Sequence, residues 1–96
     1  MSPTKVRRDR LRRLSDLPNV GPAMSSDFEL LGIRTPQQLR GKDPLALYRS
    51  LCRMSGVRQD PCVLDIIISV TRFMDGEAPR PWWAYTAERK RRFGDI

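Results

Sequence analysis

The stretch Leu14-Ser15-Asp16-Leu17-Pro18-Asn19-Val20-Gly21-Pro22-Ala23 decides the fold of this chain. Its segment Asn19-Val20-Gly21-Pro22 combines residue types that favour a tight turn, and a proline suits the first position of a helix because its φ is already helical. Apolar residues then recur at helical spacing from Met24 to Leu31, and Gly32 suits the residue that follows a helix. The stretch therefore predicts a short helix, a tight turn and a second helix.

This arrangement resembles the helix-hairpin-helix motif of DNA-repair and recombination proteins. In that motif a glycine lets the backbone approach a phosphate, which free N–H groups then bind at the positive end of a helix dipole. The resemblance implies a phosphate site at the hairpin of residues 18–24, with DNA-binding residues Asn19, Val20, Gly21, Ala23 and Met24. Contact of this kind does not read bases, so the expected DNA binding is independent of sequence.

Two positions depart from the motif. Asn19 stands where the motif has its first hairpin glycine, and asparagine tolerates the positive φ that the turn needs. Ala23 stands where DNA-binding members commonly have lysine, so a phosphate-neutralising charge is missing. Two interpretations stay open: the hairpin binds a phosphate, or it only joins two helices.

The positive charge of the chain lies at its two ends. The formal net charge is +7, and 15 of the 18 basic residues are arginine, which suits bidentate phosphate contact. Residues 1–15 carry a net charge of +5 and residues 85–96 carry +2, so residues 16–84 are neutral. Basic segments of this kind bind polyanions or simply keep a protein soluble. The candidate DNA contacts are Arg7, Arg8, Arg10, Arg12, Arg13, Arg89, Lys90, Arg91 and Arg92.

The rest of the chain predicts short helices separated by proline and glycine. Thr35-Pro36, Asp43-Pro44 and Asp60-Pro61 each combine a capping residue with a proline at a helix start. The segment after Asp60-Pro61 is apolar on nearly all sides, so it should be the buried centre. We also expect Thr86 to cap a last basic helix. The fold class is all-α: a compact bundle of five or six short helices with a SAM-like architecture that contains the hairpin.

Three parts are expected along the chain. Residues 1–15 form a basic N-terminal segment whose first residues fray, residues 14–88 form the helical domain, and residues 89–96 form a basic C-terminal tail. If residues 4–14 form a helix, the arginines in its first turns oppose the helix dipole. These arginines would then have a role other than stabilising that helix.

Five separated blocks resemble one bacterial family, the pathogenicity locus family, whose older members are called mitomycin resistance proteins. The blocks are Leu17-Pro18-Asn19-Val20-Gly21-Pro22-Ala23, Leu30-Leu31-Gly32-Ile33, Asp43-Pro44-Leu45, Asp60-Pro61-Cys62-Val63-Leu64-Asp65 and Pro81-Trp82-Trp83-Ala84-Tyr85-Thr86. The resemblance implies a helix-hairpin-helix domain and, through the older name, a link to DNA damage. It implies no particular reaction.

Several functional classes are excluded or disfavoured by composition. The chain has no histidine, which removes histidine-based catalysis and imidazole metal sites. Its two cysteines, Cys52 and Cys62, are too few for a disulfide framework or a four-ligand zinc site and are expected to be free structural thiols. No secretory signal or membrane-spanning stretch is visible, so a cytoplasmic protein without a membrane role is expected. We expect no enzyme activity, no cofactor and no metal.

Trp82 and Trp83, with Tyr85, have two possible roles. They could form a stacking platform for unpaired bases beside Arg80, but aromatic residues after a Pro-x-Pro turn more often close a small core, which is the favoured expectation. The function predicted from the sequence is non-sequence-specific DNA binding, linked to DNA damage or repair. The alternative is a protein–protein interaction module with no role in nucleic-acid binding.

Overall fold

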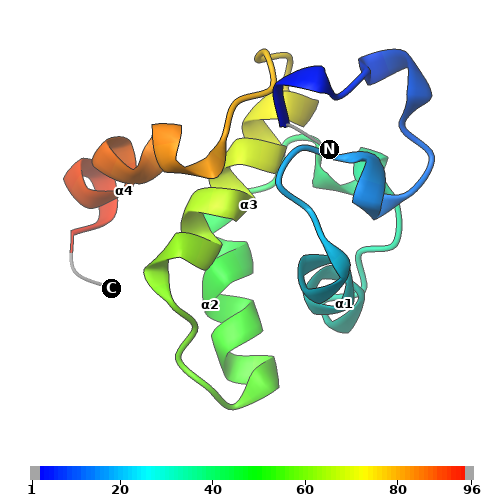
Figure 1. The fold of residues 1–96 in the computed structure, drawn as a ribbon. Helices are drawn as coiled ribbons and strands as arrows, with labels where there is room; N and C mark the ends of the chain where they lie inside the picture. The colour runs from blue at the N-terminus through cyan, green and yellow to red at the C-terminus, as the bar shows by residue number, and fades with distance from the viewer. Residues whose placement is uncertain (1–2, 95–96) are drawn as a thin grey trace.

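Three of the four α-helices found within residues 3–94 begin with a proline, as the sequence predicts. The computed structural model describes residues 3–94, with α1 at Pro22–Leu30, α2 at Pro44–Ser55, α3 at Pro61–Met74 and α4 at Thr86–Phe93 (Figure 1). The Asp43 and Asp60 side chains cap α2 and α3 by accepting hydrogen bonds from the N–H groups of Leu45 at 3.0 Å and Cys62 at 2.9 Å. Each cap satisfies a donor that the helix leaves unpaired.

The remaining helical segments are 3₁₀ turns. They are η1 at Pro3–Lys5, η2 at Arg8–Arg10, η3 at Leu14–Asp16, η4 at Pro36–Leu39 and η5 at Trp82–Tyr85. No strand occurs within residues 3–94, which confirms the all-α fold class. The expected count of five or six helices is not confirmed, because these positions form single turns rather than α-helices. The backbone is extended at Arg7 and Leu11, so residues 4–14 do not form one helix.

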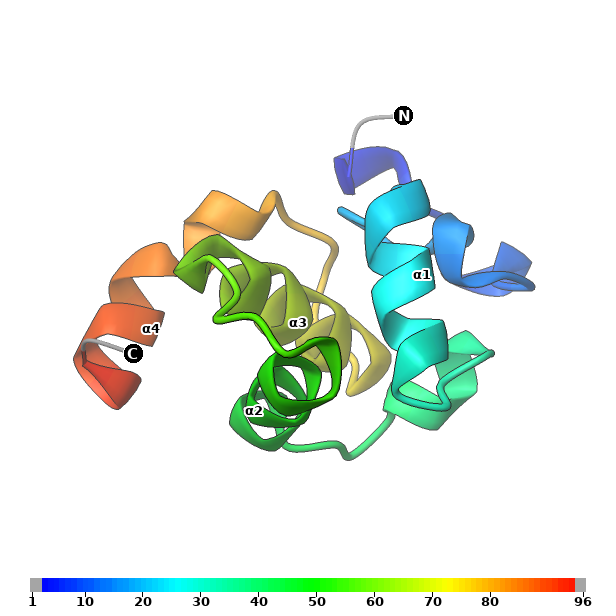
Figure 2. The same cartoon turned by 90° about the horizontal axis from the view of Figure 1, so that it is seen from below.

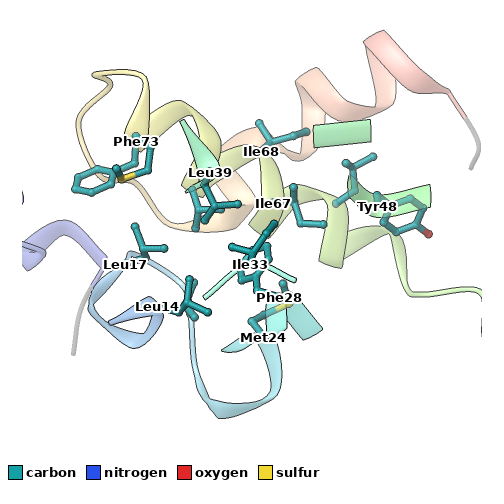
Figure 3. Close-up of a cluster of buried hydrophobic side chains, with 14 of the residues drawn as sticks. Leu14, Leu17, Met24, Phe28, Ile33, Leu39, Tyr48, Ile67, Ile68 and Phe73 are labelled. Carbon is teal, nitrogen blue, oxygen red and sulfur yellow. The ribbon is translucent and has the colours of Figure 1, made fainter. Parts of the chain in front are cut away.

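The core is built around α3, which was expected to be the buried centre. Nine of its 14 residues are buried, and α2 packs against it on one face. Figure 3 shows side chains from α1, α2 and the N-terminal region meeting those of α3 in one cluster. Leu14 and Leu17, at 5% and 3% exposed, anchor the basic N-terminal segment to this cluster. The Cα radius of gyration of 12.3 Å agrees with the roughly 12.5 Å expected for one folded unit of this length.

A buried ion pair attaches α4 to α3. Asp65 is fully buried, and its carboxylate accepts hydrogen bonds from Arg89 Nε at 2.9 Å and from Thr86 Oγ1 at 2.7 Å. The expectation that Thr86 caps the last helix is wrong, because this hydroxyl is engaged by Asp65 and Tyr85 takes the capping position. None of the helices within residues 3–94 is long and apolar enough to span a bilayer.

Candidate nucleic-acid interface

The hairpin turn, residues 18–24, is fixed to the rest of the fold by Asn19. Its φ of 66° confirms the positive φ expected at this position. Its side-chain nitrogen donates to Ser69 Oγ at 2.9 Å and to the Arg80 carbonyl at 2.8 Å, and its oxygen accepts from the Trp82 N–H at 3.2 Å. Because the amide group is used within the protein, Asn19 can offer a ligand only its backbone.

The first turn of α1 carries no side-chain cap. Its N-cap residue is Gly21, whereas α2 and α3 are capped by aspartates. The N–H groups of Ala23 and Met24 therefore have no acceptor in their own helix. Val20 and Met24 are 8% and 6% exposed, so their side chains belong to the core and only their backbones can serve a ligand.

The glycine at position 21 is not required by the local backbone. Its φ of −100° and ψ of −170° are extended values that any residue adopts. A Cβ built on Gly21 would meet nothing within 4 Å, so the surface above it is open. A glycine there keeps the N-terminus of α1 accessible to a group that approaches from outside.

Arginines of the N-terminal segment lie beside α1. Arg12 and Arg13 line a surface hollow together with Ser25 and Glu29 of α1, and Arg34 lines the same hollow. The N–H groups of both arginines donate to the Asp16 carboxylate, at 2.9 Å for Arg12 and 2.8 Å for Arg13. These backbone hydrogen bonds, that of Arg13 first, hold the pKa of Asp16 below its usual value.

A second hollow of the N-terminal segment is lined by Lys5, Arg7, Arg10 and Asp16. Arg7 and Arg10 are among the contacts predicted from the sequence, whereas Lys5 and Arg34 are not. Arg34 follows α1 in the sequence and lies outside both basic ends, so no run of charge marks it. Only the fold brings it to the same hollow as Arg12 and Arg13.

Arg8 has a structural role in this segment. Its guanidinium donates to the Phe73 carbonyl at 2.5 Å and to the Glu77 carbonyl at 2.7 Å, and it lies 4.0 Å from the centre of the Phe73 ring. Phe73 lies in the last turn of α3, where a cation near the carbonyl oxygens is favoured by the helix dipole. Arg8 thus fastens the N-terminal segment to α3.

The C-terminal basic residues do not join those of the N-terminal segment. Figures 1 and 2 show α4 and α1 on opposite sides of the α2–α3 pair. Arg89 is only 9% exposed, and its ion pair with Asp65 removes it from the set of available phosphate contacts. Arg92 pairs with Glu88 at 2.9 Å, while Lys90 and Arg91 are exposed. The predicted contacts therefore fall on two separate surfaces.

The expectation that both tryptophans close the core is wrong for Trp83, which is 62% exposed. Trp82 is half-buried and meets Trp83 edge to face, with ring centres 5.5 Å apart. Tyr85 is buried and its hydroxyl donates to Glu77 Oε1 at 3.3 Å, so it belongs to the core and not to a stacking platform. The rigid Pro79-Arg80-Pro81 segment fixes where this turn lies.

Metal-ligating side chains do not cluster in the part of the chain that the structure describes. No group of three or more cysteine, aspartate or glutamate side chains gathers as metal ligands within residues 3–94. Cys52 and Cys62 are both free and half-buried. Burial, together with the adjacent Asp60 carboxylate, raises the pKa of the Cys62 thiol, which disfavours the reactive thiolate.

Comparison with known proteins gives two findings of similarity. The sequence pattern of the pathogenicity locus family matches residues 7–91. The mitomycin resistance protein McrB of Streptomyces lavendulae is 45% identical over 78 residues, which cover 81% of this chain and 74% of that protein. No solved structure shows a significant match.

Proposed function

This chain belongs to the pathogenicity locus family, and we propose that it binds DNA without sequence specificity through the hairpin turn and the arginines of its N-terminal segment. The carrying observation is the open, uncapped N-terminus of α1, together with the hollow that Arg12 and Arg13 share with Ser25 and Glu29 further along the same helix. The mitomycin resistance named for the Streptomyces relative supports a link to DNA damage. Residues 14–24 would then act as a helix-hairpin-helix motif whose first helix is the single turn η3.

The hairpin turn contributes position rather than most of the affinity. Backbone N–H groups at the start of a helix suit a phosphate oxygen, because they combine free donors with the positive end of the dipole. Ala23 offers no charge there, so the neutralising charges must come from neighbouring residues. Arg12, Arg13 and Arg34 share a hollow with Ser25 and Glu29 of α1 and are the candidates for this role.

Gly21→Val tests the role of the hairpin turn with little risk to the fold. Position 21 has an extended backbone that suits a β-branched residue, and the new side chain points into open space. The added bulk would keep a phosphate away from the N–H groups of α1. Ala46→Val creates the same valine side chain on the exposed surface of α2, by adding two carbons where Gly21→Val adds three, and is the control.

The proposal predicts that Gly21→Val weakens binding to a labelled duplex by about tenfold in fluorescence anisotropy, which corresponds to about 1.4 kcal/mol. The thermal midpoint should stay close to that of the wild type, and Ala46→Val should bind normally. Unchanged affinity in a folded Gly21→Val protein would assign the hairpin turn a purely structural role.

A protein–protein interaction module is the second candidate function. It is favoured by Ala23 at the position where a lysine would serve DNA, and by Leu30, which is 44% exposed on α1. Salt separates the two functions, because each phosphate contact should cost about 0.9 log units of affinity per decade of salt. An apolar protein interface would respond little to salt.

A further inference from the structure

A groove lies between the hairpin turn and the two tryptophans. It has a volume of about 390 Å³ and is lined by residues 17–21, Trp82 and Trp83, with Val6 and Ser15 completing the lining. This volume falls within the range of small-molecule and cofactor sites. The groove is therefore large enough to hold a flat ring together with part of the group attached to it.

The two indole rings suit a flat aromatic ligand. Their planes stand at 83°, so a ring that stacks on one indole face meets the other indole as a perpendicular wall. Trp83 is 62% exposed, which leaves most of its surface free to contact a ligand. Exposed aromatic rings that line a groove are typical of sites where bases stack.

Two residues that line the groove, Val6 and Ser15, connect it to basic residues. Val6 is flanked in the sequence by Lys5 and Arg7, which line a second hollow with Arg10 and Asp16. Ser15 lines both the groove and the hollow of Arg12, Arg13 and Arg34. A ligand that places a ring in the groove and extends past Ser15 would meet the positive charge of Arg12 and Arg13, which indicates a flat ring carried on a polyanion.

We infer that this groove takes an unpaired base of DNA, stacked on Trp83, while the strand continues over the flanking arginines. The inference rests on the proposed DNA binding and deepens it. Both faces of a base in a duplex are covered by its neighbours, so only a single-stranded or extruded base can stack on an indole. The protein should therefore prefer single-stranded or gapped DNA to an intact duplex.

Trp83→Ala is the direct test, because most of this side chain lies in solvent and its loss should leave the fold intact. Met54→Ala removes another exposed apolar side chain, 57% exposed at the end of α2, and is the matched control. The probes are a labelled twelve-nucleotide oligothymidylate and a labelled duplex of the same length. Trp82 and Trp83 are the two tryptophans of the chain, so quenching of its intrinsic fluorescence reports on the groove directly.

The expected result is quenching by the single strand and a loss of at least about fivefold in its affinity for Trp83→Ala, since base stacking on aromatic residues is worth this much or more. Trp83→Phe should recover part of the loss, and Met54→Ala should behave as the wild type. Binding to both probes with no quenching and no effect of Trp83→Ala would overturn the base site and leave the proposed function standing. Failure of the wild-type chain to bind either probe at low salt would overturn both.

Discussion

Replacing Arg89 by methionine should destabilise the protein rather than only weaken its binding to DNA. The side chain is 9% exposed, and its Nε donates to Asp65 Oδ1 at 2.9 Å. Methionine fills a similar apolar volume but removes the charge, so the Asp65 carboxylate would stay fully buried with only Thr86 as a side-chain donor. An uncompensated buried charge is a costly defect in a small core.

The size of the effect follows from the burial of the pair. Breaking a buried ion pair on one side costs about 3–5 kcal/mol, whereas most folded domains have about 5–15 kcal/mol in total. At about 4 °C or more per kcal/mol for a chain of this size, the melting midpoint should fall by at least about 12 °C. Replacing both partners, in Asp65→Leu/Arg89→Met, should recover most of the loss because no charge is left buried.

Chemical denaturation of the wild type, both variants and Arg91→Met would measure this. Arg91 is exposed on the same helix, so its substitution should change the free energy of unfolding by no more than about 0.5 kcal/mol. A loss of under about 1 kcal/mol for Arg89→Met would refute the structural role of the ion pair. Arg89 would then return to the set of candidate DNA contacts.

Three further predictions concern the N-terminal segment and the hairpin turn. Asn19→Ala should lower the free energy of unfolding in urea by about 3 kcal/mol, because alanine would be strained at a φ of 66° and three hydrogen bonds would be lost. Asn19→Gly loses the same hydrogen bonds without the backbone strain, so it should cost less. Equal losses for the two variants would contradict the role of φ. Arg8→Ala should speed amide hydrogen exchange in residues 3–13, because the hydrogen bonds from Arg8 to the Phe73 and Glu77 carbonyls are lost. Unchanged protection of these amides would contradict the structural role of Arg8. Asp16 has a lowered pKa in the folded state, so its contribution to stability is present above about pH 4 and lost as the pH falls through that pKa. Asp16→Asn should therefore flatten the fall in unfolding free energy between about pH 5 and pH 3, and parallel curves for the two proteins would exclude this carboxylate as a source of acid sensitivity.

Local signals predicted the α-helices well. The proline starts at positions 22, 44 and 61, and the apolar surface of α3, mark these helices in the sequence because their cause lies within a few residues. The structure of the N-terminal segment could not be predicted from such local signals. Its arginines weaken a helix, and Arg8 bonds to carbonyls 65 and 69 residues away, which no local pattern reveals.

The candidate interface was predictable only in part. The positive φ of Asn19 followed from the residue type, but its bonds to Ser69, Arg80 and Trp82 depend on packing. The ion pair between Asp65 and Arg89 likewise joins two helices that are separate in the sequence. The run of basic residues at positions 89–92 therefore could not show that Arg89 is buried. The exposure of Trp83 reversed the usual preference of tryptophan for burial, and this exception supports the proposed base site.

The central claim is that DNA binds on the side of the hairpin turn, and a matched pair of charge variants tests it most directly. Arg12→Gln/Arg13→Gln and Lys90→Gln/Arg91→Gln each remove two exposed positive charges, which lowers the net charge from +7 to +5 in both proteins. Duplex affinity would be measured by anisotropy across a salt series. We predict that the first variant loses about tenfold in affinity. Its plot of log affinity against log salt concentration should be less steep, by the equivalent of up to about two phosphate contacts. The second variant should change little in either quantity. Equal losses in the two variants would contradict a defined interface at the hairpin turn.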